Sequence, residues 1–79
     1  MTRIELRKHI ICCKNLKEMN SVQDILSYLG ERTLFLNCHE SKVFNINCEY
    51  DFWGITKEPA TLTFRDFIAE FGDQTPLDY

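Results

Sequence analysis

The strongest pattern in this chain is a strict alternation of apolar and polar residues inside the run VFNINCEYDF, residues 43–52. From residue 44 to residue 52 the even positions are apolar and the odd ones polar, with Phe44, Ile46, Cys48, Tyr50 and Phe52 against Asn45, Asn47, Glu49 and Asp51. Successive side chains of a strand point to opposite faces of a sheet, so the pattern predicts one half-buried β-strand over the whole run. The rest of the chain must then supply neighbouring strands and helices that cover the apolar face.

Capping signals predict two helices. Asn15 can cap a helix with Glu18 three residues later, and Gly30 supplies the left-handed position that ends it. Thr63 caps a second helix that ends at Gly72. Helical spacing gives each helix one apolar face, formed by Leu16, Met19, Val22, Ile25, Leu26 and Leu29 in the first and by Phe64, Phe67, Ile68 and Phe71 in the second.

Residues 33–38 form another β-prone run, and we predict that they make a β-hairpin with residues 43–52. Directly opposed residues share a face of a sheet, so Leu34 and Leu36 should lie opposite even-numbered positions such as Phe44.

Residues 3–13 fit either a strand or a helix. Thr2 and Glu5 have the spacing of a helix start, whereas Ile4, Leu6, Ile10 and Cys12 would share one face of a strand, and we favour the strand. The predicted fold is a single α+β domain over residues 1–72, with a loose tail at 73–79. Its antiparallel sheet has three or four strands in β-α-β-β-(β)-α order, and two helices cover one face.

The composition is that of an ordinary globular domain of 79 residues with a net charge of −3. The charged start lacks the apolar segment of a secretory signal, and no apolar run reaches the roughly 18 residues of a membrane span, so we expect a cytoplasmic protein without membrane contact. In that compartment the four cysteines are expected to be thiols rather than disulfides.

Four cysteines and two histidines invite a zinc site, with His9, Cys12, Cys13, Cys38, His39 and Cys48 as the candidate ligands. Only His9 and Cys12 approach the spacing of a ligand pair, so we favour cysteines that pack as small apolar residues, and keep a zinc-stabilised domain as an alternative. A catalytic dyad of His9 with Cys12 or Cys13 lacks any signature of an oxyanion hole, and three glycines cannot build a phosphate-binding loop. We therefore predict no enzyme activity and no cofactor.

Charge is distributed unevenly along the chain. Residues 1–17 carry five basic residues against one acidic one, and residues 40–79 carry eight acidic residues against three basic ones. We expect the two charges to neutralise each other within the fold. Nucleic-acid binding through the basic segment is the alternative, which the lack of aromatic residues there disfavours.

These exclusions predict a small non-enzymatic protein-binding module, an inhibitor or accessory protein of the antitoxin, immunity or phage anti-defence kind. It would block a macromolecular partner, another protein, through its sheet face and its hairpin. An exposed edge strand would also allow a homo-oligomer. The predicted contact residues are Asn45, Asn47, Glu49, Asp51, Trp53, Glu40 and Lys42.

Overall fold

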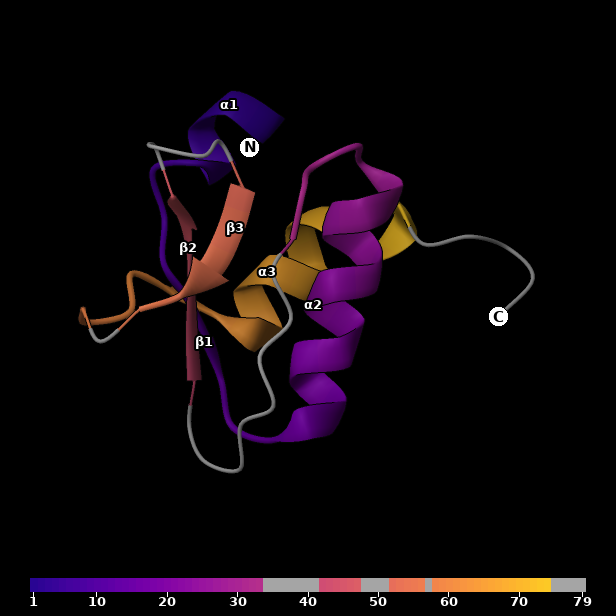
Figure 1. Cartoon of the computed structure of the whole chain (residues 1–79). Helices are drawn as coiled ribbons and strands as arrows, with labels where there is room; N and C mark the ends of the chain where they lie inside the picture. The colour runs from indigo at the N-terminus through magenta and orange to yellow at the C-terminus, as the bar shows by residue number, and fades with distance from the viewer. Residues whose placement is uncertain (34–41, 48–51, 57, 75–79) are drawn as a thin grey trace.

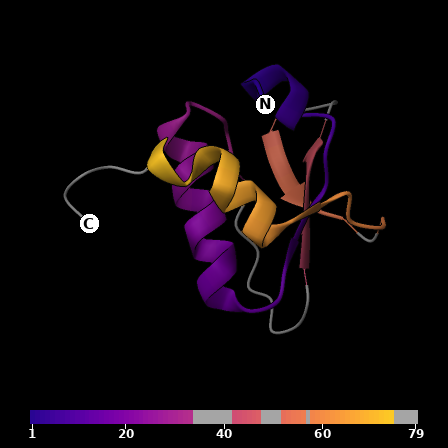
Figure 2. The ribbon, with the colours of Figure 1, turned by 180° about the vertical axis from the view of Figure 1, so that it is seen from behind.

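The computed structural model describes residues 1–33, 42–47, 52–56 and 58–74. Its elements are α1 (Arg3–Leu6), β1 (Ile11–Cys13), α2 (Leu16–Tyr28), β2 (Lys42–Asn47), β3 (Phe52–Ile55), β4 (Leu62–Thr63), α3 (Phe64–Phe71) and the 3-10 helix η1 (Gly72–Gln74). They form two layers. The sheet makes one layer, α2 and α3 lie together on one of its faces, and α1 lies at one end of the sheet (Figure 1). The view from behind shows the same two layers (Figure 2).

The sheet is mixed, with the strand order β3-β2-β1-β4. β2 is antiparallel to β1 and to β3, whereas β4 runs parallel to β1. The predicted antiparallel sheet in β-α-β-β-(β)-α order is therefore wrong. The amides of Thr61 and Leu62 both donate to the carbonyl of Ile10, at 2.8 and 3.0 Å, and this starts β4 alongside β1 in the same direction. The long connection through α2, β2 and β3 supplies the crossover that parallel pairing needs.

The alternating run from residue 43 to 52 is not one strand. Asn47 pairs with Phe52, Asn45 with Gly54 and Phe44 with Ile55, so the chain reverses direction between Asn47 and Phe52. The prediction of a single strand there is wrong, because β2 and β3 form the hairpin.

The predicted hairpin between residues 33–38 and 43–52 is also wrong, because the pairing that it requires at Phe44 does not occur. Phe44 pairs with Ile11 on one side and with Ile55 on the other, which leaves no edge of β2 for another strand at this position. Thr33 instead forms an isolated parallel bridge with Trp53. Residues 34–38, with Leu34 and Leu36, lie outside the described residues.

Residues 3–13, for which we favoured a strand, contain both a helix and a strand. Thr2 caps α1 by accepting the Glu5 amide on its hydroxyl oxygen at 3.1 Å, which is the helix start that its spacing with Glu5 indicated. Leu6 is buried, and the chain then becomes β1 from Ile11 onward.

The two longer helices confirm the capping signals. The side chain of Asn15 accepts the Glu18 amide at 2.9 Å at the start of α2, and Thr63 accepts the Asp66 amide at 3.1 Å at the start of α3. Gly30 has φ +86°, the left-handed conformation that ends α2. Residues 73 and 74, placed in the tail by the sequence, belong to η1, and residues 75–79 lie outside the described residues.

The core fills the space between the sheet and the helices. Its buried side chains come from α1, β1, α2, β3, β4 and α3: Leu6, Ile11, Cys13, Met19, Val22, Ile25, Leu26, Trp53, Leu62, Phe67 and Phe71. The rings of Phe67 and Phe71 lie with centroids 5.6 Å apart. Burying each large apolar side chain contributes about 1.5–3 kcal/mol, so α2 and α3 are held mainly by this layer.

Candidate functional site

The face of the sheet opposite α2 and α3 is one candidate surface. Direct pairing places Cys12, Asn45, Phe52, Gly54 and Thr63 on this side, and we call these described residues the open sheet face. All five are partly or fully exposed, whereas Ile11, Cys13 and Trp53 on the helix side are buried. Figures 1 and 2 show no helix over the open sheet face. The connection between β3 and β4, described at residues 56 and 58–61, passes on this side of the sheet. The face is therefore free of helices but is partly crossed by this connection.

The predicted contact residues do not form one continuous row. Asn45 lies in the middle of β2, opposite Gly54, and is partly exposed. Asn47 pairs with Phe52 at the end of β2, and Lys42 pairs with Cys13 at its start. Glu40, Glu49 and Asp51 lie outside the described residues. We predicted that residues 45, 47, 49 and 51 share one face because we expected one continuous strand. The hairpin between β2 and β3 means that this reason no longer holds.

Trp53 is not on the surface. Its side chain is 0% exposed and belongs to the core, because position 53 lies on the helix side of β3. Its amide donates to the carbonyl of Arg32 at 2.6 Å, which ties β3 to the chain leaving α2. Within the described residues its indole N–H has no hydrogen-bond partner. Trp53 is thus a core residue that cannot serve as an exposed contact.

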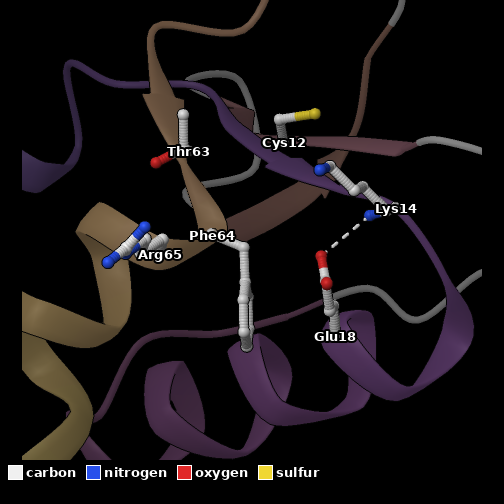
Figure 3. A pocket seen from close by; sticks show the side chains of 6 residues that line it. All are labelled: Cys12, Lys14, Glu18, Thr63, Phe64 and Arg65. Atoms are coloured by element: carbon white, nitrogen blue, oxygen red, sulfur yellow. Dashed lines mark hydrogen bonds between the residues drawn. The ribbon is translucent and has the colours of Figure 1, made fainter.

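A cleft of about 300 Å³ opens where the sheet layer meets the starts of α2 and α3. Figure 3 shows the six side chains that line it, which come from β1 and its end, from α2, and from β4 and α3: Cys12, Lys14, Glu18, Thr63, Phe64 and Arg65. β1 and β4 are parallel neighbours, and a helix begins shortly after each of them. The cleft therefore lies beyond the carboxyl ends of two parallel strands, a common position for ligand sites in α/β sheets.

The polar groups of the cleft are held in different ways. The Glu18 carboxylate accepts the backbone amide of Lys14 at 3.0 Å (Figure 3), and the Thr63 hydroxyl oxygen accepts the Asp66 amide. The side chains of Lys14 and Arg65 are exposed, and neither has a hydrogen bond or ion pair with another described residue. Phe64 is half-buried and packs against the core. The cleft thus combines two cationic groups, one carboxylate and an aromatic wall.

The adjacent cysteines differ in exposure. Cys12 is partly exposed and lines the cleft, whereas Cys13 is buried on the helix side of β1. Burial, with smaller effects of Glu18 and Cys12, raises the pKa of the Cys13 thiol to about 12. Cys13 therefore remains a neutral thiol at physiological pH, the wrong state for a nucleophile.

His9 lies beside Thr61 rather than in a cluster of ligands. Its Nδ1 atom is 3.2 Å from the Thr61 hydroxyl oxygen, which also accepts the Ile10 amide at 2.7 Å. Among the described residues, no three His, Cys, Asp or Glu side chains come together as a metal site. Cys38, His39 and Cys48, the other candidate zinc ligands, lie outside those residues.

Part of the basic segment is neutralised by a buried acid. Arg7 binds Glu31 with two hydrogen bonds, Nε to Oε1 at 3.0 Å and a terminal nitrogen to Oε2 at 3.1 Å. Arg3 Nε lies 3.2 Å from the same Oε1 atom and also donates to the carbonyl of Leu29. For these two arginines the neutralising carboxylate thus comes from Glu31, which lies outside the acidic stretch 40–79. The N-terminal amine of Met1 instead pairs with Glu70 of that stretch, at 3.0 Å. Two of the five basic residues proposed for nucleic-acid binding are therefore engaged within the fold.

Sequence reasoning missed the cleft. Thr63 and Glu18 were recognised only as capping residues, and Phe64 only as part of an apolar helix face. The missing fact was the parallel pairing of Cys12 with Thr63, which brings residues 12 and 63 side by side. The cleft could have been suspected from one sequence signal, namely that each of two β-prone segments is followed closely by the start of a helix.

No family model, no curated protein and no solved structure matches this chain. In the described part of the chain, no helix combines the length and apolar character that a membrane crossing requires.

Proposed function

We propose that this protein is a non-enzymatic protein-binding module, an inhibitor or accessory protein that blocks another protein through its open sheet face. The observation that supports this most directly is the one-sided covering of the sheet. Both long helices lie on one face (Figures 1 and 2). The strand register places partly exposed Asn45, Phe52 and Gly54 on the opposite face.

The chemistry of the open sheet face favours a protein over a nucleic acid. Its described residues are an amide, a thiol, an aromatic ring, a glycine and a hydroxyl, and none of them carries a charged side chain. Phosphate backbones are bound mainly by Lys and Arg, so this face lacks the groups that would bind one. An aromatic residue beside neutral polar groups is instead typical of protein interfaces. The partner we propose is a folded protein with a neutral, partly apolar surface.

The test uses a matched pair of asparagines. Asn45 lies on the open sheet face, and Asn20 is exposed on α2 in the other layer. A partner is first captured from the native host with the wild-type chain, then purified and titrated against the variants by calorimetry. We expect Asn45→Arg to weaken binding at least tenfold, because a large charge would be placed in a neutral interface, whereas Asn20→Arg should bind like the wild type.

Equal binding by Asn45→Arg and the wild type would refute the assigned face. A dimer of the wild-type chain that Asn45→Arg dissociates would also contradict the proposal, since the face would then bind a second copy. Light scattering of the purified protein measures this second outcome directly.

A further inference from the structure

The cleft beyond β1 and β4 is a second candidate surface, which shares Cys12 and Thr63 with the open sheet face. From its shape and its charged groups we propose that it binds a small phosphate monoester, a phosphate group carried on an apolar body. Its volume of about 300 Å³ is at the lower end of the range for small-molecule sites.

The cationic groups provide the first argument. Lys14 and Arg65 line the same cleft, on either side of Phe64 in Figure 3, and neither side chain is engaged by another described residue. Glu18 is the one carboxylate of the lining, and the Lys14 amide already binds one of its oxygens. The lining therefore carries a net positive charge in a chain whose overall charge is −3. Lys and Arg are the side chains that bind phosphate most strongly, through charge-assisted hydrogen bonds.

The number of donors provides the second argument. The Thr63 hydroxyl oxygen accepts the Asp66 amide, and its own hydrogen remains available to donate to a ligand. An ammonium, a guanidinium and a hydroxyl thus offer donors from three positions. The three terminal oxygens of a phosphate monoester match this set better than the two oxygens of a carboxylate do.

The apolar part of the lining provides the third argument. Phe64 and Cys12 both line the cleft, and in Figure 3 the Phe64 ring points toward α2 while the Cys12 thiol lies on the other side of β1. The ring is therefore the apolar wall of the cleft. Inorganic phosphate would leave this ring without a partner, whereas a ring or a short apolar chain on the phosphate would cover it. Asn15 and Thr63 each accept one amide of the first helical turn, those of Glu18 and Asp66. We assign the binding of the ligand to the side chains of the lining.

The experiment is a titration of the isotopically labelled full chain, followed by the NMR signals of the amides of Lys14, Phe64 and Arg65. Phenyl phosphate is the probe, and benzoate, phenol and inorganic phosphate are compared with it at constant ionic strength in sodium chloride. We expect saturable shifts with phenyl phosphate, and binding at least fivefold weaker for each of the other three compounds. Equal binding of benzoate, phenol or inorganic phosphate would overturn the assignment of a phosphate monoester.

Charge-neutral variants test the residues. The double variant Lys14→Gln, Arg65→Gln should bind phenyl phosphate at least tenfold more weakly. The matched control Lys8→Gln, Lys17→Gln removes two exposed cations outside the cleft and should bind within twofold of the wild type. All four substituted side chains are exposed, so both double variants are expected to fold. Equal loss in the two double variants would show a general effect of charge and would refute the site.

Discussion

Glu31 is the residue on which the position of α1 depends. Its side chain is 2% exposed, while those of Arg3 and Arg7 are 50% and 36% exposed. The carboxylate is therefore the desolvated member of the cluster, and the two guanidinium groups keep contact with water. No pattern around residue 31 indicates this role, because the pairing exists only after α1 has folded against the end of α2. The sequence showed an excess of basic residues near the start of the chain, but not their partner.

Replacing Glu31 with Gln should lower the free energy of unfolding by about 1–3 kcal/mol, since the two charge-assisted hydrogen bonds to Arg7 are weakened inside the fold. Glu5→Gln, on exposed α1, is the control and should change it by less than about 0.5 kcal/mol. Chemical denaturation measures both. In the Arg7→Gln background, the effect of Glu31→Gln should be smaller, and an unchanged effect would contradict the coupling of the two residues.

Because of Cys13, the free energy of unfolding should change with pH in the alkaline range. The folded-state pKa of Cys13, about 12, lies above the ordinary pKa of 9.0 for a cysteine thiol, so the folded state holds the proton more tightly than the unfolded state does. The stabilising effect is complete below pH 9 and is lost as the pH rises from 9 toward 12, because the unfolded chain then ionises first.

The measured quantity is the difference in free energy of unfolding between the wild type and Cys13→Ala. This difference should be smaller at pH 10 than at pH 8, by about 1 kcal/mol. Urea denaturation at the two pH values, under reducing conditions, measures this difference. Val22→Ala, which removes a buried side chain that does not ionise, is the control, and its difference from the wild type should stay constant between the two pH values. A constant difference for Cys13→Ala would contradict the raised pKa.

At the level of elements, the features that depend on neighbouring residues could be predicted and those that depend on long-range pairing could not. Asn15 and Thr63 mark the helix starts through hydrogen bonds to amides three residues away. The reversal between Asn47 and Phe52 has no comparable signal. No Gly or Pro occurs in residues 48–51, and the alternation of apolar residues continues through them. Phe52 continues the even-numbered pattern, yet it lies on the face opposite to Trp53 and the core.

Gly30→Ala should lower the free energy of unfolding by about 1 kcal/mol, because φ +86° is unfavourable for a residue with a Cβ atom. Gly30→Asn should lose less, since Asn tolerates this conformation better. Gly54→Ala is the control, because a Cβ atom there would make only an ordinary contact of 3.8 Å with Phe52. Thermal or urea unfolding distinguishes the three variants, and equal effects of Gly30→Ala and Gly30→Asn would argue against the conformational explanation.

At the level of the whole molecule, the parallel pair β1 and β4 is the feature that local reasoning could not reach. β4 has two residues, and the run around Leu62 and Thr63 is too short for a periodic signal. Its position depends on the hydrogen bonds between Thr61, Leu62 and Ile10. The same pairing creates the cleft, so a site that needs residues from both strands was also hidden. Of the predicted contact residues, Asn45 lies on the open sheet face as defined here. Trp53, which was predicted to lie beside it, belongs to the core.

The parallel pair also determines when during synthesis the fold can be completed. β1 emerges early, but its neighbour β4 and the covering residues Phe67 and Phe71 are made some fifty residues later. Until then the core around Ile11 and Met19 lacks Leu62, Phe67 and Phe71, which complete its cover. A nascent chain that stops before residue 62 therefore exposes apolar surface and an unpaired edge of β1, which other chains can bind. For such a chain, premature termination leads to aggregation rather than to a smaller folded protein.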